Sequence, residues 1–186
     1  MSSIEEMIKD TLEFNKKFVE EKRYEEYAAT KYPDKKLAIL SCMDTRLTEL
    51  LPAALNLKNG DVKLIKTAGA FISHPWGSVM RSLIVSVYML KVENVFVIAH
   101  YDCGMEGLTA DKLVEKMRER NIGKEKFDTV RNSGIDINRW ITGFSKIEDS
   151  VTNTVNTIKN HPFIPESVGV YGFAIDPGTG RLDRVV

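Results

Sequence analysis

The sequence predicts an α/β protein of three layers, with a mainly parallel central sheet of four or five strands flanked by helices. Short apolar runs alternate with stretches of helical period along the 186 residues, a pattern typical of parallel sheets with right-handed crossovers. Two apolar runs end abruptly in reactive side chains, at residues 37–46 (LAILSCMDTR) and 95–104 (VFVIAHYDCG). Ligands bind at the carboxyl ends of strands in such sheets, so these two stretches predict where a site lies.

The predicted strands are apolar runs bounded by turn signals. They cover residues 37–41, 62–66, 94–99 and 167–175. The turn DPGTG at residues 176–180 follows, and residues 181–186 are expected to form a fifth strand, antiparallel at the edge.

The predicted helices follow from near-helical spacing of apolar residues. They cover residues 4–27, 48–57, 78–90, 109–120 and 136–160, the last broken near Gly143. Ser3 is a candidate cap for the first helix, with Glu6 three residues on. Pro52 is expected in the first turn of its helix or at a kink. Residues 121–134 are expected to be loop-like, with a short helix as the alternative. Residues 1–30 are expected to form an N-terminal helical arm on a single domain of residues 1–186.

Composition excludes several classes of function. The hydrophobic fraction is 43% and the charged fraction 28%, as in an ordinary globular protein. Basic and acidic residues number 26 each, which weighs against nucleic acid or an anionic membrane as the main partner. The N-terminus lacks the basic-then-apolar pattern of a secretion signal. A cytoplasmic protein is therefore expected, in which the two cysteines are reduced.

Three side chains could hold a metal ion. Cys42 directly follows the first predicted strand, and His100 and Cys103 follow the third. Thiolate and imidazole are the ligands that zinc prefers, and an open site with three protein ligands is catalytic. Two thiolates would neutralise the dication but also reduce its Lewis acidity, so activity is expected to rise on the alkaline side.

Asp44 and Arg46 alternate with Cys42 along the chain. If this segment stays extended, the three side chains point to one side. A carboxylate beside a guanidinium forms an oriented pair, which could orient the nucleophile that the metal activates. If the pair breaks, the Asp44 carboxylate can itself bind the metal and close the site.

These residues resemble the β-class carbonic anhydrases, in their compact prokaryotic-type branch. The resemblance lies in Cys42-x-Asp44-x-Arg46 and His100-x-x-Cys103-Gly104, within residues 37–113, and extends to the tail SVGVYGFAIDPGTGRL. It implies zinc bound by Cys42, His100 and Cys103, with Asp44 as an alternative fourth ligand. It also implies an Asp44–Arg46 catalytic dyad that serves reversible hydration of carbon dioxide to bicarbonate and a proton. A homodimer or higher homo-oligomer is implied as well, with the N-terminal helix packed on the neighbouring subunit.

The resemblance leaves the substrate open. Related folds hydrolyse carbon disulfide or carbonyl sulfide with the same ligands, and a non-catalytic zinc-binding or bicarbonate-binding protein would keep Asp44 on the metal. The chain also departs from the family where the loop that often reads Arg-Asn-Ala-Gly is Lys-Thr-Ala-Gly, at residues 66–69. That change could alter the pocket wall or the dimer contact, whereas zinc binding should survive it.

Other interpretations of single residues stand beside these. Each cysteine alone could be a small buried hydrophobic residue, and the two could form a redox pair, although no C-x-x-C occurs. His74 is a loop histidine or a proton shuttle, and His161 is expected at the surface. Asp102 lies between two candidate ligands, where it could orient the loop or contact backbone amides, and it is assigned no chemistry. No nucleotide-binding glycine motif is present.

Overall fold

The computed structural model describes residues 3–186, and it confirms the α/β prediction. Its five-stranded sheet has the order β2-β1-β3-β4-β5, in which the first four strands are parallel and β5 runs antiparallel to β4. The strands are β1 (Leu37–Cys42), β2 (Val62–Thr67), β3 (Asn94–His100), β4 (Gly169–Ile175) and β5 (Leu182–Arg184). The α-helices are α1 (Ile4–Glu20), α2 (Leu47–Ala54), α3 (Ser78–Leu90), α4 (Ala110–Glu119), α5 (Lys124–Asn132), α6 (Ile137–Ile141) and α7 (Ile147–Lys159), and the 3₁₀ helices are η1 (Arg23–Tyr27) and η2 (Ala68–Ala70).

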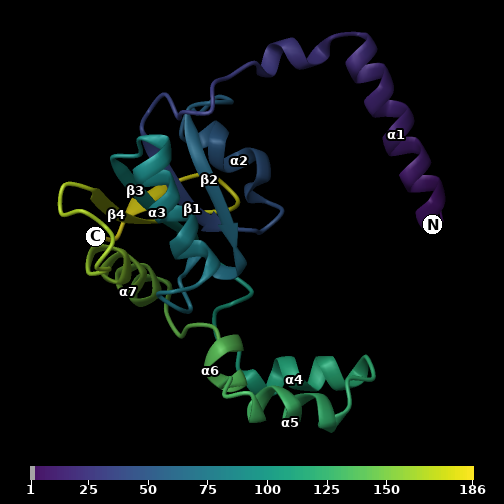
Figure 1. Cartoon of the computed structure of the whole chain (residues 1–186), viewed down its shortest axis with the longest axis vertical. Helices are drawn as coiled ribbons and strands as arrows, with labels where there is room; N and C mark the ends of the chain where they lie inside the picture. Colours follow the sequence, from purple (N-terminus) through teal and green to yellow (C-terminus); the bar gives the residue numbers. More distant parts are fainter. Residues whose placement is uncertain (1–2) are drawn as a thin grey trace.

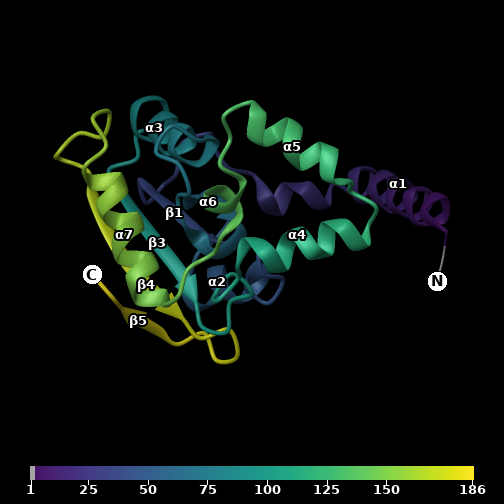
Figure 2. The same cartoon turned by 90° about the horizontal axis from the view of Figure 1, so that it is seen from below.

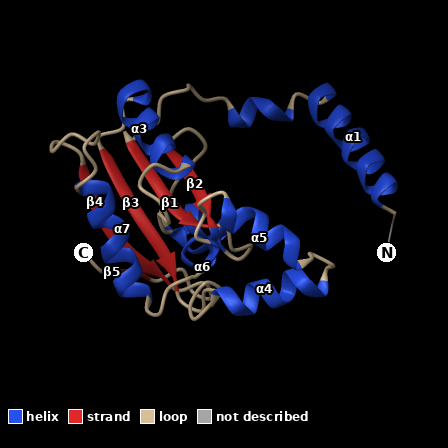
Figure 3. Cartoon of the chain, turned by 60° about the horizontal axis from the view of Figure 1, so that its bottom comes forward, coloured by secondary structure: helices blue, strands red, loops and turns tan. Residues whose placement is uncertain are grey.

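The strand order fixes which face each helix covers. The connection from β1 to β2 runs toward one edge of the sheet, and the connections from β2 to β3 and from β3 to β4 run toward the other edge. Because such crossovers are right-handed, α2 lies on one face of the sheet, and α3 and α7 lie on the other. Figure 2 shows this three-layer arrangement from below, and Figure 3 shows the strands running side by side between the helices.

The core lies around β1 and β3. All six residues of β1 are buried, because this strand lies between two parallel neighbours and under helices on both faces. Ser41 is the polar member of the strand, and its hydroxyl donates to the carbonyl of Ile98 at 3.1 Å. This bond ties β1 to β3 one residue before Cys42.

Several predicted elements differ in their bounds. The first helix stops at Glu20 rather than Tyr27, because Lys22 adopts a left-handed conformation (φ 53°) and a 3₁₀ turn follows. α2 begins at Leu47, so Pro52 lies in its second turn and the helix ends soon afterwards. In the loop-like stretch 121–134, the short helix that was the alternative forms as α5. The predicted break near Gly143 is confirmed between α6 and α7.

Two groups of helices project from the sheet. Figure 1 shows α1 and η1 extending to one side and α4, α5 and α6 extending below. The structure describes every residue of α1, and none of them is buried. Ser3 caps it, as predicted, by accepting a hydrogen bond from the Glu6 amide at 3.2 Å. Met1 and Ser2, with which the predicted arm begins, lie outside the described residues.

Gly143 brings the chain between α6 and α7 against the loop that follows Cys103. Its amide donates to the Leu108 carbonyl at 2.9 Å, and a Cβ at this position would collide with the carbonyl oxygen of Met105. We therefore expect Gly143→Ala to lower the free energy of unfolding by about 1–3 kcal/mol, as overpacking does, measured by urea denaturation.

Gly104 is the matched control for this substitution. An added Cβ there meets nothing within 4 Å, so Gly104→Ala should change stability by less than about 0.5 kcal/mol. Equal losses in the two variants would contradict the assigned role of the close approach at Gly143.

Candidate metal centre

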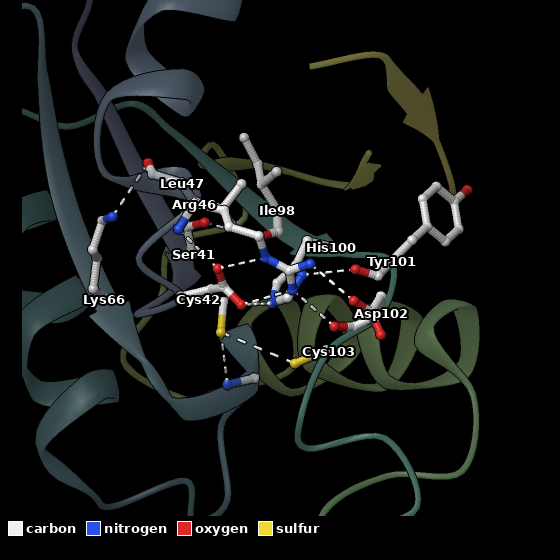
Figure 4. Close-up of polar contacts among 12 residues, drawn as sticks. Ser41, Cys42, Arg46, Leu47, Lys66, Ile98, His100, Tyr101, Asp102 and Cys103 are labelled. Carbon is white, nitrogen blue, oxygen red and sulfur yellow. Dashed lines mark hydrogen bonds and ion pairs between the residues drawn. The ribbon is translucent and has the colours of Figure 1, made fainter. Parts of the chain in front are cut away.

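The structure brings Cys42, His100 and Cys103 together at the carboxyl ends of β1 and β3. Their candidate ligand atoms all lie within 4.8 Å of one another, and all three residues are buried (Figure 4). The meeting follows from topology, because β1 and β3 are parallel neighbours in register. Cys42 ends β1 and His100 ends β3, and a short loop returns Cys103 to the same point.

The imidazole of His100 is oriented for a metal. Its Nδ1 lies 2.8 Å from the carbonyl oxygen of Tyr101, and since a carbonyl only accepts, Nδ1 carries the proton. The Nε2 lone pair is then free, and this buried atom has no hydrogen-bond partner among the described residues. A backbone carbonyl that fixes the tautomer in this way is common behind metal-binding histidines.

The two sulfur atoms lie at a spacing that suits a shared ion. They are 4.0 Å apart, close to the ~3.8 Å that two Zn–S bonds of about 2.3 Å span at a tetrahedral centre. The hydrogen bond from Cys103 lowers the pKa of the Cys42 thiol, and the same contact, with burial, raises the pKa of Cys103. Cys42 thus gives up its proton more readily than Cys103, and the donor set of two sulfurs and one imidazole nitrogen fits zinc.

Metal binding is expected to release a proton. Both sulfurs bind a metal as thiolates, so the ion must displace the proton that Cys103 holds near pH 7. We expect release of at least about one proton per ion, and an apparent zinc affinity that rises about tenfold per pH unit for each proton released. Calorimetry in two buffers of different ionisation enthalpy measures the release. Zinc binding that is independent of both buffer and pH would contradict this protonation state.

Asp44 and Arg46 form the predicted pair, but the backbone between them is not extended as predicted. The segment does not stay extended after Cys42, since it turns into α2 with Arg46 in the helical region (φ −63°, ψ −23°). Oδ1 of Asp44 accepts from the amide of Arg46 at 2.9 Å and from its Nε at 3.0 Å, and Oδ2 accepts from Nη2 at 2.9 Å. Oδ2 also lies 3.7 Å from Nε2 of His100, so the paired carboxylate borders the metal-ligand cluster.

This pairing fixes the charge of Asp44. The hydrogen bonds from Arg46 lower the pKa of the Asp44 carboxyl to about 2. Because this pKa is lowered, the ion pair contributes fully to stability at any pH above the ordinary carboxyl pKa of 3.8. That contribution is lost only as the pH falls toward 2. Asp44 is therefore an anion throughout the range in which the protein would work.

Asp102 contacts the guanidinium from the other side, which the sequence did not predict. Its Oδ2 accepts from Nη1 of Arg46 at 2.8 Å and its carbonyl from Nη2 at 3.0 Å (Figure 4). The only sequence signal for it was a charged residue between two candidate ligands.

Two apolar side chains lie close to Gly69, whose amide contacts the sulfur of Cys42. The amide of Gly69 donates to that sulfur at 3.4 Å, and a Cβ on Gly69 would meet Met105 and Phe144 at 3.0 Å. Gly69 has φ +81°, a left-handed conformation that favours glycine. Lys66, which departs from the family's loop sequence, donates from its Nζ to the Leu47 carbonyl at 3.3 Å.

The other two histidines belong to one loop contact. His74 is exposed, and its Nδ1 accepts from the Trp76 amide at 3.1 Å. The prediction for His161 was wrong, since this residue is only 4% exposed. Its Nε2 donates to the Pro75 carbonyl at 3.1 Å, its ring packs on Trp76, and its burial follows from this long-range contact.

The chain is similar to several known proteins over most of its length. A family model described as "Carbonic anhydrase" matches residues 37–182. The Bacillus subtilis protein named "Putative carbonic anhydrase YtiB" is 52% identical over 180 residues, 97% of this chain and 96% of that protein. The crystal structure of β-carbonic anhydrase isoform I from Trichomonas vaginalis superposes with a TM-score of 0.87 at 30% identity, covering 100% of this chain and 98% of that one. A carbon disulfide hydrolase from Acidithiobacillus thiooxidans is 22% identical over 156 residues, 80% of this chain and 76% of that protein.

The fold and the donor set define an α/β protein with a centre able to hold a metal ion. The chain belongs to the β-carbonic anhydrase family. Among residues 3–186, no helix is both long and apolar enough to cross a membrane.

Proposed function

We propose that this protein is a zinc-dependent carbonic anhydrase, which hydrates carbon dioxide reversibly to bicarbonate and a proton. The observation that carries the proposal is the convergence of Cys42, His100 and Cys103 beside a carboxylate that is held by an arginine. Membership of the family supports it. The residues proposed as metal ligands are these three, with Asp44 as an alternative fourth, and the proposed catalytic residues are Asp44 and Arg46.

Zinc, when bound, would supply the Lewis acidity that makes water a nucleophile near neutral pH. Asp44 accepts a hydrogen bond from the attacking water and directs its lone pair toward the carbon of carbon dioxide. Arg46 keeps both oxygens of Asp44 engaged, so the carboxylate stays anionic and fixed. Met105 and Phe144 offer an apolar wall to a substrate that has no charge. One water and one carbon dioxide give bicarbonate, and the remaining proton passes to solvent.

Two alternatives are separated by experiment. A carbon disulfide hydrolase is among the relatives, so hydrolysis of carbon disulfide or carbonyl sulfide is the second candidate. The pairing of Asp44 with Arg46 favours an enzyme over a non-catalytic protein in which Asp44 stays on the metal. Stopped-flow hydration of carbon dioxide against pH, beside assays on both sulfur compounds, decides the matter. We expect hydration that rises on the alkaline side, and turnover of the sulfur compounds alone would overturn the proposal.

We propose a single domain with an N-terminal arm, working in the cytoplasm as a homodimer or a larger homo-oligomer. Reduced thiols at the centre need a reducing compartment. The arm supports an oligomer, because α1 exposes an apolar stripe with the spacing of one helix face. The stripe consists of Ile4, Met7, Ile8 and Leu12. A second copy of the chain would cover it.

Charges in this stripe should therefore break the assembly. Replacing both Ile8 and Leu12 by aspartate removes about 1.5–3 kcal/mol of favourable burial free energy per side chain. The dissociation constant of the oligomer should therefore rise by at least about a hundredfold. Light scattering after size exclusion measures the mass against the 21.0 kDa of one chain. Lys9→Asp, on another face of α1, is the control. An unchanged mass in the double variant would contradict the proposed role of the arm.

A further inference from the structure

Arg46 engages two carboxylates at once with different hydrogens. Its Nε and one Nη2 hydrogen donate to the carboxylate of Asp44. Nη1 donates to the carboxylate of Asp102, and the other Nη2 hydrogen donates to the main-chain carbonyl of Asp102. Four of the five guanidinium hydrogens are thus directed at two residues. Since the planar fork cannot turn without breaking contacts on both sides, the two partners reinforce one another rather than compete.

Asp102 makes its contacts from an unusual backbone. It has φ 55°, a left-handed conformation that aspartate tolerates better than most residues. This conformation lets the carboxylate and the main-chain carbonyl of one residue both reach Arg46. Asp102 also lies between His100 and Cys103 in the chain, so the guanidinium links the segment after β1 to the loop after β3. Cys42 and His100 directly precede these two segments, and Cys103 lies in the second.

We propose that Asp102 is a positioning residue, which holds the Arg46 guanidinium on Asp44 and so keeps that carboxylate away from the metal. The second half of this inference rests on the proposed metal site, whereas the first half concerns the protein alone. The contact is at the surface, because the Asp102 side chain is 84% exposed and that of Arg46 41%. It therefore adds little to stability, and its effect is on where Arg46 and Asp44 point.

The first test uses the metal-free protein. NMR of the Arg46 Nε–H, which donates to Asp44, reports how often that bond opens to exchange with water. Losing one exposed ion pair should accelerate the exchange about two- to fivefold in Asp102→Asn and in Asp102→Gly. Glycine accepts the left-handed backbone, so the second variant isolates the carboxylate. Glu106→Gln is the control, because it removes a nearby exposed charge that makes no side-chain bond to Arg46 in the described structure.

The second test uses the same proteins loaded with cobalt(II) alone. Visible absorption distinguishes a carboxylate on the ion from a site left open to solvent. At one pH, the ratio of the carboxylate-bound to the open form should rise about two- to fivefold in both Asp102 variants, and Asp44→Asn should abolish that form. Unchanged exchange in both Asp102 variants would overturn the proposal. Faster exchange with an unchanged cobalt spectrum would overturn its second half. Failure of every protein to bind cobalt would count against the metal site, while the exchange measurement still decides the role of Asp102.

Discussion

Replacement of Cys42 by serine is expected to lower the affinity for zinc by about two to three orders of magnitude. Small structural zinc sites gain about 10–16 kcal/mol from four ligands, so one thiolate contributes about 2.5–4 kcal/mol. Serine keeps the size of the side chain, but its hydroxyl stays protonated and binds zinc weakly. Competition with a chromophoric chelator measures the affinity, and hydration activity should fall with zinc content.

Met43→Ala is the matched control for this variant. Met43 follows Cys42 directly, and its side chain is exposed. The control should keep stoichiometric zinc and the activity of the parent protein. A Cys42→Ser protein with stoichiometric zinc and full hydration activity would remove the basis of the proposed centre.

Asp44→Asn is expected to lower kcat about a hundredfold while zinc stays bound, because removing one preorganised hydrogen-bonding group from an active site costs about 10²–10³-fold. The amide oxygen can still accept from the Arg46 amide, so the turn into α2 survives. The negative charge that would orient the nucleophile is lost. Metal analysis together with stopped-flow hydration separates the loss of chemistry from the loss of zinc.

Asp61→Asn is the control for Asp44→Asn. Asp61 also accepts a backbone hydrogen bond, from Lys58 at 2.9 Å, and it precedes β2 rather than following a strand end. It should retain the parent kcat. Full activity in Asp44→Asn would show that the carboxylate takes no part in the reaction.

The meeting of the three candidate ligands could be predicted because it depends on strand topology. Cys42 and His100 end apolar runs, and neighbouring parallel strands bring such ends to one edge. The Asp44–Arg46 pair was predicted from an extended segment and is formed by a turn instead. The pairing was recovered nonetheless, because an aspartate two residues before an arginine can reach it in either conformation.

What the sequence did not reveal depends on contacts between distant segments. Asp102 reaches Arg46 only because of its left-handed backbone, which no local pattern specified. His161 is buried because it meets Pro75 across 86 positions of the chain. The helix α5 was foreseen only as a short helix within a loop-like stretch, because its sequence, KEKFDTVRN, is almost entirely polar. Phe127, its buried residue, lies under the guanidinium of Arg118 from α4.

X-ray absorption at the zinc K-edge of the purified protein tests the central claim most directly. A centre made by Cys42, His100 and Cys103 predicts two sulfur neighbours at about 2.3 Å and lighter neighbours at about 2.0–2.1 Å, including the scattering of one imidazole. A zinc shell of nitrogen and oxygen alone, or a protein that carries no metal after preparation in zinc, would contradict it.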